Sequence, residues 1–189
     1  MRRLFALAVA WLTAAAPLAA FAAPPPPVEQ DVRGARDFNG LPRMADARIR
    51  AWRSLSVAEI ILPTGPVAEG GAPEKALRLQ GQISHIDYVI RPAAAPIDMA
   101  RHYEEVLRDG GYETVFSCVG IARCGSGMGS LILLGDAVSP AGFADGVFND
   151  QLRVIVARKG ATWVLLHMTR GPDRSLVYQA VIEGARELE

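Results

Sequence analysis

His85 and Asp87 are the two residues whose types and spacing most suggest catalytic chemistry. They lie two positions apart in a strand-like stretch, and alternate residues of a strand share a face. A histidine beside a carboxylate could therefore act as a general base with its orienting partner. A catalytic triad also needs a nucleophile, and no serine or cysteine has an identifiable place beside this pair. We expect a solvated pair on the outer face of a sheet, with a catalytic pair as the alternative.

Cys118 and Cys124 are the only cysteines in the chain. Five residues separate them, which excludes a C-x-x-C redox pair, and the three histidines show no recognisable zinc spacing. In an oxidising compartment two such cysteines form a structural disulfide. The sequence predicts this cross-link, and it predicts neither a metal site nor a cofactor.

A glycine-rich stretch, residues 125–129, follows the second cysteine and could suggest a phosphate-binding loop. A dinucleotide fingerprint needs G-x-G-x-x-G between a strand and a helix, whereas a strand-like run follows here. The stretch also lacks the lysine and hydroxyl residue that end a P-loop. Cys124 and Met128 break the G-x-S-x-G frame of a nucleophile elbow. We expect a flexible loop held at its base by the disulfide.

The first 22 residues have the three parts of an export signal. A basic start and an apolar run precede the small-x-small cleavage site Ala20-Phe21-Ala22. Pro17 interrupts the apolar run, so a permanent membrane span is the weaker interpretation. After this signal we expect a proline-rich linker at 23–30 and a single exported domain at 31–189, without a transmembrane span. The exported location, periplasmic or otherwise outside the cytoplasm, supports the disulfide.

The charge balance argues against nucleic acid as a partner. The chain has 20 basic and 20 acidic residues, so it lacks the basic excess of a nucleic-acid-binding domain. A local string of arginines occurs at positions 43, 48, 50 and 53. We expect this string to form a solvated strand face.

A long strand and a helix dominate the pattern of elements. In the strand, 76–91, apolar residues change parity halfway, and a β-bulge near Ser84-His85 would keep them on one face. The helix spans about 96–110: Pro96 suits its first turn, and Gly110-Gly111 suits a left-handed C-cap. Its sheet-facing residues recur at helical spacing: Ile97, Ala100, Tyr103 and Leu107.

The remaining elements read as strands. Short strands are expected at 49–53, 57–62 and 112–118, with an apolar strand-like run at 131–134. Residues 151–170 suggest a hairpin that turns at Lys159-Gly160 and places Val156 opposite Trp163. Residues 175–182 fit a strand or a helix, and we choose a strand. The fold class is therefore α+β: an antiparallel sheet of about six to eight strands with one main packed helix.

With these residues laid out, the chain resembles an uncharacterised family of exported proteobacterial domains, often found N-terminal to OmpA-like peptidoglycan-binding domains. The resemblance covers most of residues 31–182 and implies a periplasmic α+β domain with the disulfide. It carries over no catalytic residues. Because this chain stops at Glu189, where the peptidoglycan-binding domain would begin, direct cell-wall attachment is not implied. The matching segments are Gly34–Asp37, Leu41–Arg43, Leu62–Gly65, Lys75–Tyr88, Tyr103–Tyr112 and Phe116–Gly125.

These observations favour a non-catalytic envelope domain that binds another envelope component, either a protein or a peptidoglycan-associated partner. The candidate binding residues are Arg36, Arg43, His85 and Asp87. Arg36 and Arg43 could instead form ion pairs that fix the N-terminal segment. Two alternatives stay open: a periplasmic enzyme that uses the His85/Asp87 face, and an accessory subunit of an outer-membrane assembly.

Overall fold

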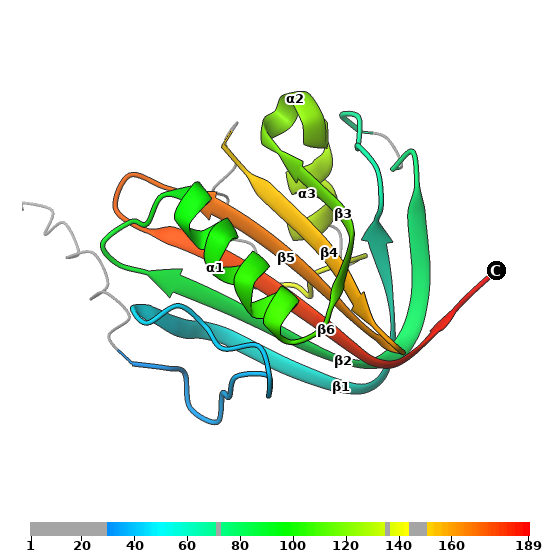
Figure 1. Ribbon diagram of the computed structural model, residues 1–189, viewed down its shortest axis with the longest axis horizontal. Coiled ribbons are helices and arrows are strands. Elements are labelled where there is room, and N and C mark those ends of the chain that lie inside the picture. Colours follow the sequence, from blue (N-terminus) through cyan, green and yellow to red (C-terminus); the bar gives the residue numbers. More distant parts are fainter. Residues whose placement is uncertain (1–29, 71–72, 135–136, 144–150) are drawn as a thin grey trace, which may run out of the picture.

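Six antiparallel strands form one sheet whose two faces are both covered (Figure 1). The computed structural model describes residues 30–70, 73–134, 137–143 and 151–189. The proposed export signal and all but the last residue of the proline-rich linker lie outside these ranges. The strands follow one another across the sheet in the order β1-β2-β6-β5-β4-β3. Their bounds are β1 Ala47–Pro63, β2 Ala76–Ile90, β3 Glu113–Val119, β4 Arg153–Lys159, β5 Thr162–Arg170 and β6 Ser175–Glu187.

Within the described ranges, three helices and the N-terminal segment cover the sheet. Helix α1, Pro96–Asp109, lies on one face together with residues 30–46, and α2 (Gly120–Cys124) and α3 (Met128–Leu133) lie on the other. We call these the α1 face and the α3 face. The α+β class and the six strands are confirmed, and the two short helices are additional to the single helix expected.

The first two predicted strands are one. β1 runs without a break and pairs with β2 along its length, with register shifts at Ile49/Ala51 and Leu55/Ala58. The register shifts are β-bulges, and a β-bulge adds a residue without ending the strand.

The bulge predicted near Ser84-His85 is wrong. β2 pairs continuously with β6 from Gln82 to Ile90, and the register shift of that pairing lies at Gln80/Gln82. The change of parity has another cause: both faces of the sheet are buried, so each parity has an apolar core to enter. Leu79 and Ile83 pack on the α3 face. The apolar residues near the end of β2 have the other parity and pack on the α1 face: Ile86, Tyr88 and Ile90.

Helix α1 packs on the sheet as expected, with one change in its buried stripe. Pro96 begins the helix, and Gly111 follows it with a φ of 74°. Ile97 is 40% exposed, and Met99 is buried in its place. Met99 lies four residues before Tyr103, so it belongs to the same helical stripe. The other buried residues are Pro96, Ala100, Tyr103 and Leu107.

Residues 120–134 differ most from the expectation. The strand predicted at 131–134 is wrong, because these residues belong to α3 and its C-terminal end. Ile132 and Leu133 are adjacent buried residues, a pattern that fits a short helix pressed onto a core as well as a strand. The glycine-rich stretch is not a free loop: the amide of Gly127 donates to the carbonyl of Val67 over 2.9 Å. The Val67 amide in turn donates to the Cys124 carbonyl over 2.9 Å.

The predicted hairpin is present, but its register is wrong. Lys159 pairs with Thr162, so the turn residues are Gly160 and Ala161, and Val156 faces Leu165 where Trp163 was expected. Gly160 has a φ of 59°, which an L-residue rarely adopts, and this fixes the turn one residue later. β5 is central and buried on both faces, as predicted, and residues 175–182 form a strand.

Candidate functional site

His85 and Asp87 lie on a buried face of the sheet and not on a solvated one. Their residues are 3% and 1% exposed, beneath the strap formed by residues 137–143. The expectation of an outward-facing pair is therefore wrong. With regular pairing through this part of β2, both side chains share the parity of Leu79 and Ile83, which places them on the α3 face.

The imidazole of His85 is joined to the strap through Tyr178. Nδ1 of His85 lies 2.8 Å from the Tyr178 hydroxyl oxygen, and this hydroxyl donates to the Val138 carbonyl over 3.1 Å. A tyrosine hydroxyl has one hydrogen, and a carbonyl only accepts. The network is satisfied when Nδ1 of His85 carries its hydrogen and donates to Tyr178. Burial lowers the pKa of His85 to about 4, with a smaller contribution from the positive charge of Arg53.

Asp87 is joined to the same strap through Arg50. The Arg50 guanidinium forms an ion pair with the Asp87 carboxylate and donates to the Phe143 carbonyl over 2.9 Å. Arg50 is the extra residue of the β1 bulge, since Ile49 pairs with Tyr88 and Ala51 with Asp87. A bulge redirects a side chain, and here it brings a cation against a buried carboxylate. The arginine string is thus partly internal.

The polar residues around His85 and Asp87 hold the strap to the sheet. Asp87 forms an ion pair with Arg50, whereas His85 is hydrogen-bonded to Tyr178. The carboxylate therefore does not orient the imidazole. His167, the register partner of Tyr178, is also buried, and burial lowers its pKa to about 4. Its Nε2 has no hydrogen-bond partner among the described residues. Within the described ranges, no group of three His, Cys, Asp or Glu residues could hold a metal ion.

Arg43 fixes the N-terminal segment. Its guanidinium forms two hydrogen bonds with the Asp31 carboxylate, of 2.7 and 2.8 Å, and a third with Asp37 of 3.0 Å. The hydrogen bond from Arg43 lowers the pKa of Asp31. The guanidinium also lies 5.8 Å from the ring centre of Tyr88, whose hydroxyl donates to Asp37. Arg43 therefore forms the ion pairs that were the alternative to a binding role.

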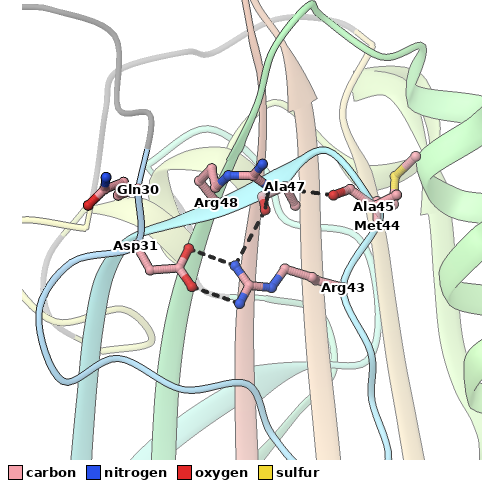
Figure 2. A pocket seen from close by; sticks show the side chains of 7 residues that line it. All are labelled: Gln30, Asp31, Arg43, Met44, Ala45, Ala47 and Arg48. Carbon is pink, nitrogen blue, oxygen red and sulfur yellow. Dashed lines mark hydrogen bonds and ion pairs between the residues drawn. The ribbon is translucent and has the colours of Figure 1, made fainter.

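In the hollow beside Arg43, the charged side chains already have partners within the protein (Figure 2). The hollow measures about 380 Å³. Arg43 reaches across it to Asp31, and Arg48 donates to the carbonyls of Ala45 and Ala47 over 3.5 and 2.9 Å. Both arginines bond to groups of the protein, and these contacts hold the N-terminal segment to the sheet.

Arg36 lies at a second hollow with a different character, on the α1 face over β1, β2 and β6. We call it the Trp52 hollow, and its volume is about 270 Å³. The guanidinium of Arg36 lies 5.4 Å from the ring centre of Trp52, a cation–π distance. The lining combines two aromatic rings with hydroxyl and amide groups: Arg36, Asp37, Phe38, Asn39, Trp52, Ser54, Gln82, Ser84, Ile86 and Glu183.

Two charged side chains of the Trp52 hollow have no ion-pair partner among the described residues: Arg36 and Glu183. Glu183 is the register partner of Gln82. Its carboxylate raises the pKa of Tyr112, an effect smaller than that of burial. Asp37, which also lines the hollow, is already bound by Arg43 and Tyr88. The hollow thus has one positive and one negative side chain without an ion-pair partner among the described residues.

Sequence reasoning found Arg36 but not the rest of this hollow. Trp52 was read as part of a short strand, and Glu183 lies beyond the last predicted strand. The available signal was the polar set Ser54, Gln82 and Ser84 beside a tryptophan in strand-forming sequence. Without the sheet order, nothing in the sequence brings β6 next to β2.

The disulfide between Cys118 and Cys124 is present, with a Cα–Cα distance of 5.2 Å, as predicted. Among the described residues, no helix has both the length and the apolar character that a membrane crossing requires. Comparison with protein-family models gives no match for this chain, and comparison with curated proteins gives no significant relative.

Proposed function

We propose that this protein is an exported, non-catalytic domain of the cell envelope that binds another envelope component through the Trp52 hollow. The observation that carries the proposal is the composition of that hollow. Aromatic rings, amides and hydroxyl groups surround two charges without ion-pair partners, and ligand sites typically combine such rings with a few convergent polar groups.

The envelope location rests on three supports. The first 22 residues read as an export signal, the chain resembles a family of exported proteobacterial domains, and its two cysteines are joined. A periplasmic domain of this kind meets peptidoglycan and peptidoglycan-associated proteins, which are the partners expected from the sequence.

A non-catalytic role follows from the state of the candidate acid–base residues. His85 and Asp87 are buried and engaged with Tyr178 and Arg50, and neither lines the Trp52 hollow. A hydrolase would need a nucleophile and its base within reach of a substrate. The enzyme alternative therefore has less support than it had from the sequence.

Binding can be tested with the purified protein, sedimented with isolated peptidoglycan and, separately, used to capture material from an envelope extract. Ser54→Phe fills the hollow without removing any buried side chain, because Ser54 is exposed. We expect this variant to lose at least ten-fold in binding. Arg123→Gln, on the exposed surface of α2, is the matched control and should bind as the unchanged protein does. Equal binding by the Ser54→Phe variant, or no binding by the unchanged protein, would refute the proposal.

A further inference from the structure

We infer that the Trp52 hollow selects a zwitterionic ligand that carries an ammonium and a carboxylate group at opposite ends, such as a short peptide with free ends. This inference rests on the proposed function and specifies the ligand of the same site. The two unpaired charges carry it: Arg36 for the carboxylate and Glu183 for the ammonium group.

The two charges come from different sides of the hollow. Arg36 belongs to the N-terminal segment and contacts Trp52 of β1, whereas Glu183 belongs to β6. β2 lies between these strands, so their backbones are about 10 Å apart at the usual strand spacing. A ligand that touches both side chains must therefore present its opposite charges at opposite ends.

The neighbouring charges of the protein explain why these two remain available. Asp37 is the acidic residue closest in sequence to Arg36, but it is bound by Arg43 and Tyr88. On β6, Arg186 follows Glu183 and bonds Gln80 of β2. On each of these two segments, the opposite charge nearest in sequence is thus already engaged. Ligand groups of matching charge would complete them with charge-assisted hydrogen bonds.

The middle of the hollow fits the uncharged part of such a ligand. Ser54, Ser84 and Gln82 follow one another on the α1 face and offer hydroxyl and amide groups to a peptide bond. Ile86, Phe38 and Trp52 supply apolar surface for a small side chain. The volume of about 270 Å³ lies just below the range usual for drug-sized ligands, which suits a dipeptide.

Three probes separate the two charges: Ala-Ala with free ends, N-acetyl-Ala-Ala, which lacks the ammonium group, and Ala-Ala-amide, which lacks the carboxylate. Each is prepared with L- and with D-alanine and titrated into the full protein at low and at physiological salt. For at least one enantiomer, we expect free Ala-Ala to bind about ten-fold more tightly than either blocked form, with the preference weakened by salt.

Two variants then assign each charge. Glu183→Gln should weaken binding of free Ala-Ala but leave N-acetyl-Ala-Ala unchanged, and Arg36→Gln should weaken free Ala-Ala but leave Ala-Ala-amide unchanged. Glu113→Gln and Arg123→Gln, both exposed and neither lining the hollow, are matched controls that should change nothing. Thermal unfolding of each variant checks that the fold is kept.

The outcomes distinguish this inference from the proposed function. Equal affinity for free and blocked peptides, or no binding of any probe at millimolar concentration, would overturn the zwitterionic ligand. If Ser54→Phe still abolished binding to an envelope component, the proposed function would stand with a ligand of another class. If Ser54→Phe had no effect on envelope binding, the proposed function itself would fail.

Discussion

His85 and Tyr178 meet diagonally across two strands, with Nδ1 of the imidazole 2.8 Å from the phenolic oxygen. The register partner of His85 is Ala180, and that of Tyr178 is Asp87, so the contact joins neighbouring rows of the sheet. Tyr178 continues to the carbonyl of Val138. One chain of hydrogen bonds therefore fastens the strap to the sheet. Nδ1–H of His85 can donate in either protonation state, and it is burial that favours the neutral imidazole.

Burial of His85 and His167 predicts that the free energy of unfolding decreases as the pH falls through the range where exposed histidines protonate. Burial lowers the pKa of His85 and of His167 from 6.5 to about 4. Below pH 6.5 the unfolded chain binds two protons that the folded protein does not, so the stabilisation is complete above pH 6.5 and declines as pH falls toward 4. Each histidine should contribute a loss of about 2 kcal/mol between pH 7 and pH 5. Urea unfolding at the two pH values measures it.

The variants His85→Gln and His167→Gln identify the source of this dependence. Each removes one titrating group and should reduce the difference between pH 7 and pH 5 by about 2 kcal/mol. His102→Gln is the control, because His102 lies on the exposed side of α1, where its Nε2 bonds the Pro42 carbonyl. A pH dependence that is the same in both variants and in the unchanged protein would show that these two histidines do not cause it.

The ion pair of Arg50 and Asp87 should be costly to break from one side. Asp87 is almost fully buried, so Asp87→Ala leaves the Arg50 guanidinium beside an apolar gap. We expect the free energy of unfolding to fall by about 3–5 kcal/mol, the usual cost of removing one member of a buried pair. Asp109→Ala removes the carboxylate of an exposed pair with Arg108 and should cost less than about 0.5 kcal/mol.

The double variant Arg50→Met, Asp87→Ala tests whether the two side chains act as a pair. Removing both charges leaves no buried charge without a partner, so the double variant should be more stable than Asp87→Ala alone. If the double variant were the less stable by the full cost of a second independent substitution, the two side chains would not act as a pair. Denaturant midpoints at one pH compare four proteins: the unchanged protein, Arg50→Met, Asp87→Ala and the double variant.

Helix α1 and the disulfide could be predicted because their signals are local. Pro96 and Gly111 mark the two sides of the helix, and a helical stripe of apolar residues lies between them. The disulfide could be predicted from the spacing of the cysteines and from the export signal that the sequence suggests. These features do not depend on which strands become neighbours.

The face of His85 could not be predicted, because it depends on long-range packing. A strand with apolar residues of both parities is compatible with a bulge or with burial on both sides, and only the covering layers decide between them. Here α3 and the strap cover the parity of His85, while α1 covers the other. The same limit applied to the Trp52 hollow, whose β6 wall comes from the far end of the chain.

Arg43 should control the order of the N-terminal segment. Arg43→Lys keeps the charge but loses the paired hydrogen bonds to Asp31, so we expect a loss of about 1–2 kcal/mol. The local readout is hydrogen exchange at Ile49, whose amide donates to Asp31 over 2.8 Å. Exchange there should accelerate while the amides of β5 keep their protection. Arg101→Lys, on the exposed side of α1, is the control, and equal exchange in the two variants would contradict this role.

Gly127 should resist substitution because another backbone segment occupies the place of its side chain. A Cβ at this position would lie 2.1 Å from the carbonyl oxygen of Ala68, although the φ of −84° suits any residue. Gly127→Ala should therefore cost about 1–3 kcal/mol through displaced backbone, the range usual for overpacking. Gly65→Ala is the matched control: its Cβ would meet only Lys75 at 3.4 Å. Urea unfolding compares the two, and equal stabilities would mean that the glycine-rich stretch does not need this close contact.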